Sequence, residues 1–173
     1  MSGREPIEVT NLDIYGSAEL PWSRARDQLV GAPQAGLAFF LGTTGPDGRP
    51  HSAGFGPAYF GGDLYIVSGP GTRKSRDLAA NPAATVSVRL QDLDLILEGE
   101  ATRVTDRPTL DKVAGIYREG GWPAEVKDDA FTAPFSAPSA GPPPWYVYRF
   151  TWHTAVAVAT AEPHGATRWR FKT

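Results

Sequence analysis

The chain has 173 residues, of which 41% are hydrophobic and 21% charged, values typical of globular proteins, and its net charge is −2. This length predicts a single domain over residues 1–173. The charge argues against a general nucleic-acid binder, since such domains are usually clearly basic. Cysteine is absent, which excludes disulfides, thiolate metal sites and cysteine nucleophiles. No apolar run reaches the ~18 residues of a membrane span and no signal peptide is recognisable, so we expect a cytoplasmic protein without a membrane partner.

The first part of the chain predicts an arm, a helix and a three-strand meander. Residues 1–16 show no clear period and are expected to form an N-terminal arm. Apolar residues at helical spacing predict a helix over 17–32, with Ser17 as its N-cap. Gly61-Gly62 predicts a tight hairpin that joins a strand at 51–60 to a strand at 63–68. Apolar runs bounded by glycine- and proline-rich turns predict three strands, at 36–44, 51–60 and 63–68.

The second part predicts two helices, more strands and a long loop. Residues 74–80 predict a short helix that ends at a proline, and Asp106 is the predicted N-cap of a helix over 107–119. Gly99 marks a bulge or a close backbone approach. The proline-rich residues 122–144 are expected to form a loop without regular structure. Strands are predicted at 84–90, 95–104, 145–152, 154–160 and 166–171.

This order of elements predicts a mainly β fold with short helices. The strands are short, and turn signals separate them at regular intervals. Six or seven such strands are accompanied by only two or three helices. We therefore expect a small antiparallel barrel.

The basic segment 68–78 carries the strongest chemical signal. A strand-like run stops at a Gly-Pro-Gly turn, and Arg73, Lys74 and Arg76 follow where a helix begins. Cations are unfavourable at a helix N-terminus, whereas its unpaired N–H groups and positive dipole end favour an anion. Arginine and lysine both suit phosphate oxygens. The pattern predicts phosphate binding at Arg73 and Lys74, with Arg76 either adding a contact or facing water. It lacks the Walker A spacing, so nucleotide hydrolysis is not expected.

Other chemistry-bearing residues form no recognisable catalytic motif. The three histidines, His51, His153 and His164, lack metal-ligand spacing, so no metal site is expected. A Gly-x-Ser-x-Gly elbow is absent, which disfavours a serine hydrolase. Trp169 lies between Arg168 and Arg170 and has two interpretations. It packs in the core, or it contacts a planar ring while the arginines meet an acidic group.

The succession of these motifs resembles the pyridoxamine 5′-phosphate oxidase-like superfamily over roughly residues 35–160. Three segments carry the resemblance: GPDGRPH at 45–51, LYIVSGPGTRKSRDLAANP at 64–82 and LEGEATRVTD at 97–106. The closing ATRWRF resembles the tail of the flavin/deazaflavin oxidoreductases in this superfamily. The resemblance implies a split β-barrel that binds FMN or the deazaflavin coenzyme F-420.

The resemblance also implies which residues bind the cofactor. The phosphate-binding pair falls on Arg73 and Lys74. The remaining implied contacts come from the strand beside the ring, the residues before the helix and the tail: His51, Ser52, Ala53, Gly54, Val67, Ser68, Thr72, Trp169 and Arg170. Oxidases of this family place an arginine near the position of His51, so the choice between FMN and coenzyme F-420 stays open. The substrate-phosphate clamp of true pyridoxamine 5′-phosphate oxidases has no match.

The implied function is that of an oxidoreductase that transfers a hydride between coenzyme F-420, or FMN, and a small organic substrate. Such a role needs no conspicuous acid or base, because the cofactor carries the chemistry. The resemblance implies a homodimer with the cofactor at the subunit interface. Two alternatives stay open: a non-catalytic FMN- or haem-binding split-barrel protein, and a true FMN-dependent pyridoxamine 5′-phosphate oxidase.

Overall fold

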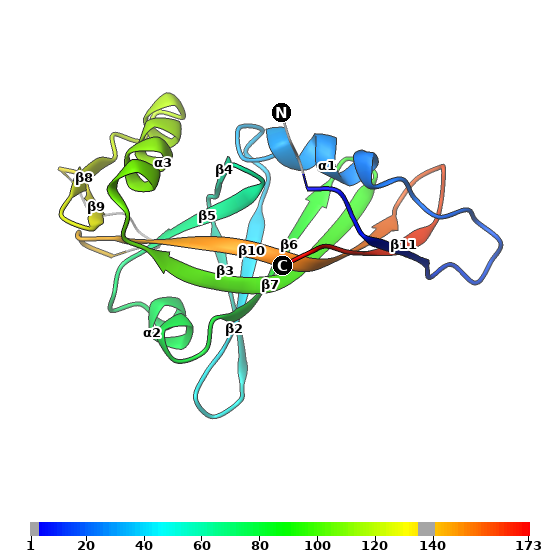
Figure 1. Cartoon of the computed structure of the whole chain (residues 1–173), viewed down its shortest axis with the longest axis horizontal. Coiled ribbons are helices and arrows are strands. Elements are labelled where there is room, and N and C mark those ends of the chain that lie inside the picture. Colours follow the sequence, from blue (N-terminus) through cyan, green and yellow to red (C-terminus); the bar gives the residue numbers. More distant parts are fainter. Residues whose placement is uncertain (1–3, 135–140) are drawn as a thin grey trace.

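The computed structural model describes residues 4–134 and 141–173, which form a mainly antiparallel β structure with three short helices (Figure 1). The helices are α1 Trp22–Gly31, α2 Arg73–Ala80 and α3 Arg107–Glu119. The strands are β1 Glu8–Asn11, β2 Phe39–Thr44, β3 Pro50–Phe55, β4 Ala58–Phe60, β5 Asp63–Ser68, β6 Ala83–Leu90, β7 Leu93–Val104, β8 Glu125–Lys127, β9 Ala130–Thr132, β10 Tyr146–Ala159 and β11 Ala166–Arg170. None of the helices in the described ranges is long and apolar enough to cross a membrane.

The main sheet is organised around the long strand β10. The strands follow the order β1-β11-β10-β7-β6-β2-β3, and β5 pairs with β10 outside this path and with β4. Every pairing is antiparallel. Within the described residues the hydrogen-bonded path does not close into a ring. The expected mainly β, antiparallel architecture is thus confirmed. Unlike the expected barrel, however, the sheet of one chain is open.

The middle of β10 is irregular at His153. We expected two strands here, but the segment is one strand whose register with β7 shifts between Trp152 and Thr154. Gly99 of β7 lies at this shift, and a Cβ on Gly99 would stand 2.1 Å from the Thr151 carbonyl oxygen. The predicted bulge or close approach at Gly99 is therefore confirmed. The bulge lies between the first half of β10, which pairs with β5, and the second half, which pairs with β11.

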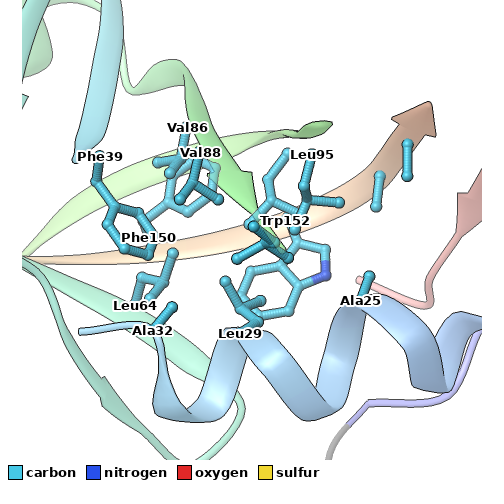
Figure 2. Close-up of a cluster of buried hydrophobic side chains, with 14 of the residues drawn as sticks. Ala25, Leu29, Ala32, Phe39, Leu64, Val86, Val88, Leu95, Phe150 and Trp152 are labelled. Atoms are coloured by element: carbon cyan, nitrogen blue, oxygen red, sulfur yellow. The ribbon is translucent and has the colours of Figure 1, made fainter. Parts of the chain in front are cut away.

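The core lies between the sheet and α1. The alternation predicted in 84–90 is confirmed, because Ala84, Val86, Val88 and Leu90 are all buried. Figure 2 shows α1 running along this cluster, with Leu29 against Trp152. Full burial of one such side chain contributes about 1.5–3 kcal/mol.

The helices confirm most of the predicted boundaries. Asp106 caps α3, since its carboxylate accepts a hydrogen bond from the Thr109 backbone N–H at 3.0 Å. The helix expected over 17–32 starts later, however, and Ser17 is not its cap. Pro21 occupies the cap position of α1 without a side-chain hydrogen bond. Leu20 before it is held outside the helix, because its backbone N–H donates to Thr167 Oγ1 at 2.8 Å.

The predicted strand 51–60 is two strands, so the expected meander is wrong. Gly56 and Pro57 separate β3 from β4, and proline cannot donate to a strand ladder. As a result β3 pairs with β2 while β4 pairs with β5. The hairpin predicted at Gly61-Gly62 is confirmed, with φ values of 62° and 88°.

Two further segments contain strands that we did not expect. In the predicted loop 122–144, β8 and β9 form a small antiparallel hairpin. Its Phe131 is buried beside Trp122 and Trp145 under α3. Residues 135–140 of that loop lie outside the described residues. The N-terminal arm contributes β1, which pairs with β11. Both strands form through distant partners, which local periodicity does not reveal.

Replacing Gly99 by Ala tests the close approach between β7 and β10. The new methyl group would collide with backbone, which cannot move aside without breaking the sheet. We expect the free energy of unfolding, measured by urea denaturation, to fall by about 3 kcal/mol. Gly31→Ala is the control, because nothing lies within 4 Å of its added Cβ. It should leave stability unchanged or raise it by about 0.5 kcal/mol. Equal stability of both variants would contradict this account of the bulge.

Candidate functional site

The basic turn connects β5 to α2 through a compact hydroxyl pair. Ser68 Oγ lies 2.6 Å from Thr72 Oγ1, and the Thr72 hydroxyl donates to the Gly69 carbonyl oxygen at 3.0 Å. Thr72 is also the N-cap of α2, because Oγ1 accepts from the Ser75 backbone N–H at 3.3 Å. Thr72 has a single hydroxyl proton, so Ser68 is the donor between the two side chains. The turn thus presents the helix N-terminus that the sequence predicted.

The three cations of this turn have different surroundings. Arg73 is half-exposed at the start of α2. Lys74 is buried, and burial lowers the pKa of its ammonium group. Arg76 is exposed and donates from Nη1 to the Gly71 carbonyl oxygen at 3.2 Å. An anion bound at this turn would favour the charged form of Lys74. Arg73 and Lys74, the predicted phosphate-binding pair, are thus consecutive residues in the first turn of α2, one half-exposed and one buried.

A buried carboxylate holds α2 against the sheet. Thr43 of β2 donates from Oγ1 to Asp77 Oδ2 at 2.8 Å, and both residues are buried. The same Asp77 oxygen lies 3.9 Å from Arg73 Nε, one helical turn away. Asp77 thus anchors the helix and orients Arg73. We did not single out Asp77 from the sequence. The signal available in the sequence was an acidic residue among the three cations of the helix. The contact between Asp77 and Thr43, however, forms only in the folded chain.

The strand β3 lies beside this anchor. His51 is opposite Thr43 in the β2–β3 register and therefore on the same face of the sheet. Its Nδ1 atom is buried and has no hydrogen-bond partner among the described residues. Ala53 shares that face, whereas Ser52 and Gly54 are exposed on the other. Within the described ranges β3 pairs with β2 alone, which leaves the backbone of its second edge available to a ligand.

The predicted tail residues do not join this site within one chain. Ser68 lies opposite Tyr146 at one end of β10, whereas Arg170 lies opposite Thr154. This separation of eight residues along β10 corresponds to roughly 27 Å. Trp169 is 1% exposed and packs against Trp22 with ring centroids 5.3 Å apart. The core-packing interpretation therefore describes its place in this structure.

The remaining predicted positions fit the same arrangement. Val67 is half-buried in β5, next to Ser68.

The described residues contain no group of three or more histidine, aspartate or glutamate side chains that could hold a metal ion. The candidate site therefore consists of the basic turn, the start of α2 and the neighbouring part of β3. It combines a positively charged helix start with an edge strand whose backbone is unpaired on one side within the described residues.

Known proteins share the fold of this chain. A family model described as pyridoxamine 5′-phosphate oxidase matches residues 25–135. A conserved hypothetical protein from Mycobacterium tuberculosis is similar with a TM-score of 0.62 and 14% identity, over 86% of this chain and 90% of that chain. A pyridoxamine 5′-phosphate oxidase-related, FMN binding protein from Nostoc punctiforme has a TM-score of 0.56 and 12% identity, over 89% and 98%. An F-420 reductase has a TM-score of 0.50 and 21% identity, over 69% and 88%.

These three structures share their fold with the chain, although their sequence identity to it is low. A search of curated proteins finds no match. The family model is decisive, since it spans well over half of the chain and includes the whole basic turn and α2. The chain therefore belongs to the pyridoxamine 5′-phosphate oxidase family.

Proposed function

We propose that the protein is an oxidoreductase that holds FMN or coenzyme F-420 by a phosphate at the basic turn. The observation that carries this proposal is the arrangement of Thr72, Arg73 and Lys74 at the start of α2. Thr72 caps this helix, and Arg73 and Lys74 occupy its first turn, where the positive end of the helix dipole and two cations favour an anion. Two similar structures, the FMN binding protein and the F-420 reductase, agree with this choice of cofactors.

The residues present fit such a cofactor. Above the turn, a Cβ on Gly71 would meet nothing within 4 Å, so a phosphate group can approach the backbone closely. Beside it, the buried Nδ1 of His51 lacks a partner among the described residues, and a polar atom of a ligand would supply one. The second edge of β3 offers backbone donors and acceptors to the rim of a planar ring. These features support the binding roles expected for His51, Ser52, Ala53 and Gly54.

The protein contributes binding and orientation to the proposed reaction. When bound, the flavin or deazaflavin supplies the hydride chemistry. Asp77 and Thr43 hold α2 in place, so Arg73 meets the phosphate in a preset orientation. The buried ammonium group of Lys74 neutralises a second phosphate oxygen, and its low exposure strengthens that attraction.

We further propose a homodimer in which two open sheets complete a split barrel around the cofactor. The open path of the sheet supports this, because β3 and β1 end it without a further strand partner among the described residues. Within one chain Arg170 lies roughly 27 Å from the basic turn along β10. The cofactor contact that the resemblance implies for Arg170 therefore requires a second copy of the chain.

Cofactor titrations test the proposed site. We expect FMN or coenzyme F-420 to bind the purified protein, measured by quenching of cofactor fluorescence. Arg73→Ala should weaken binding by about 10–100-fold, because it removes a charge-assisted hydrogen bond worth about 1.5–3 kcal/mol. Arg89→Ala is the matched control, since this exposed arginine is engaged with Asp94 at 2.6 Å. Failure to bind either cofactor, or equal binding by both variants, would refute the site.

The pH dependence of binding tests the role of Lys74. Because burial lowers the pKa of Lys74, its charge is lost at a lower pH than that of an ordinary lysine. A bound phosphate stabilises the charged form, so affinity should decrease as the pH rises through this lowered pKa. Measurements above pH 7 avoid the second ionisation of the phosphate. Lys74→Gln should bind more weakly and give a flat profile. A wild-type profile that is already flat would argue against this contact.

Turnover distinguishes the proposed enzyme from its alternatives. With the reduced cofactor bound, we expect oxidation of the cofactor by an activated alkene or a quinone, followed by absorbance. A protein that binds the cofactor without such oxidation is a non-catalytic binder. Release of hydrogen peroxide with pyridoxamine 5′-phosphate as substrate would instead identify a true pyridoxamine 5′-phosphate oxidase.

A further inference from the structure

A second groove lies on the other side of α2. It has a volume of about 460 Å³ and runs between α2 and the strands β7 and β10. Ser75, Leu78 and Ala79 line it from the helix. Arg73 and Asp77, which belong to the proposed cofactor site, lie on the opposite helical face, because residues four apart share a face. The groove thus shares Pro70 and Arg76 with the basic segment, whereas Arg73 and Lys74 do not line it.

The floor of this groove is aromatic. Tyr146 and Tyr148 of β10 project from the same face of the strand. Arg103 of β7 lies opposite Tyr148 in the register, and its guanidinium carbon is 3.5 Å from the centroid of the Tyr146 ring. A cation this close to a ring face is held in one orientation. Tyr146 and Arg103 thus form a preorganised flat surface.

The charges of the groove are positive. Arg76 and Arg103 line it, and among the described residues no acidic side chain does. Beyond the lining, Asp129 Oδ1 lies 2.9 Å from Arg103 Nη2. Burial raises the pKa of Tyr148, and contact with the Ser75 hydroxyl lowers it by a smaller amount. Tyr148 is consequently a neutral hydroxyl at physiological pH.

We propose that this groove binds a small planar organic anion of the aromatic carboxylate class. Its ring would lie against Tyr148 and the stacked pair of Tyr146 and Arg103, and its carboxylate would meet the edge of Arg103 and Arg76. The volume suits a ligand of one or two rings, since small-molecule pockets begin near 300 Å³. Arginine favours a carboxylate because its fork matches the two oxygens. This inference does not depend on the proposed redox function.

Occupation of the groove would also affect the β8–β9 hairpin. Asp129 joins these two strands and shares Arg103 with the proposed ligand. A bound carboxylate competes with Asp129 for the same guanidinium group. Removing the charge of Asp129 should therefore strengthen ligand binding, whereas removing Arg103 should weaken it. These opposite signs distinguish a carboxylate site from a groove that merely collects apolar molecules.

Calorimetric titration with 2-naphthoate tests the proposal. We expect binding with a Kd between about 10 μM and 1 mM, and weaker binding of the neutral analogue 2-naphthylmethanol. Arg103→Ala should weaken naphthoate binding at least tenfold, and Asp129→Asn should tighten it two- to fivefold. Arg107→Ala is the matched control, because this arginine forms a similar exposed pair with Asp111 at 2.9 Å. It should bind as the wild type does.

Two further measurements keep the interpretation clear. Arg73→Ala should bind naphthoate normally, since that residue belongs to the other face of α2. Circular dichroism establishes that each variant is folded, and Asp129→Asn provides a test that leaves the groove intact if Arg103→Ala does not fold. The proposal is wrong if naphthoate does not bind at about 10 mM, if the alcohol binds equally well, or if the Asp129 variant binds no more tightly.

Discussion

The contact between Gly99 and the Thr151 backbone is the constraint on which this structure depends. Only a residue without a side chain allows β7 to approach β10 so closely, and the register shifts at that point. The resulting bulge lets one strand serve two partners, with β5 beside its first half and β11 beside its second. Since β5 leads directly into the basic turn, the bulge also sets where the candidate cofactor site lies relative to the tail of the chain.

A second constraint is the buried bond between Thr43 and Asp77. Burying a carboxylate is unfavourable unless it is hydrogen-bonded and paired, and here it accepts from Thr43 and lies near Arg73. Because Asp77 anchors one face of the short helix α2 to the sheet, its two faces have different surroundings. One carries the proposed phosphate site toward β3, and the other closes the groove over Tyr146 and Tyr148. One rigid element can thus serve two ligands of different chemistry.

Local signals in the sequence predicted the strands and helices wherever a short motif determines the backbone. Asp106 as a cap, Gly61-Gly62 as a turn and the alternation around Val86 were all confirmed. The errors occurred where a distant partner decides the outcome. The arm that contains β1 becomes a strand only because β11 lies beside it. The strand expected at 51–60 divides because β3 and β4 pair with different neighbours.

For the site, the composition of the basic turn was predictable from the sequence, since its glycines, hydroxyls and cations are contiguous and act through local backbone geometry. The close approach at Gly99 was predictable for the same reason. Which residues gather around that turn depends instead on the tertiary structure. It brought Asp77 and His51 to the site through strand pairing, and it separated Arg170 from Ser68 along β10. The physical reason is that side chains distant in sequence meet through sheet register and helix packing, which depend on the whole chain.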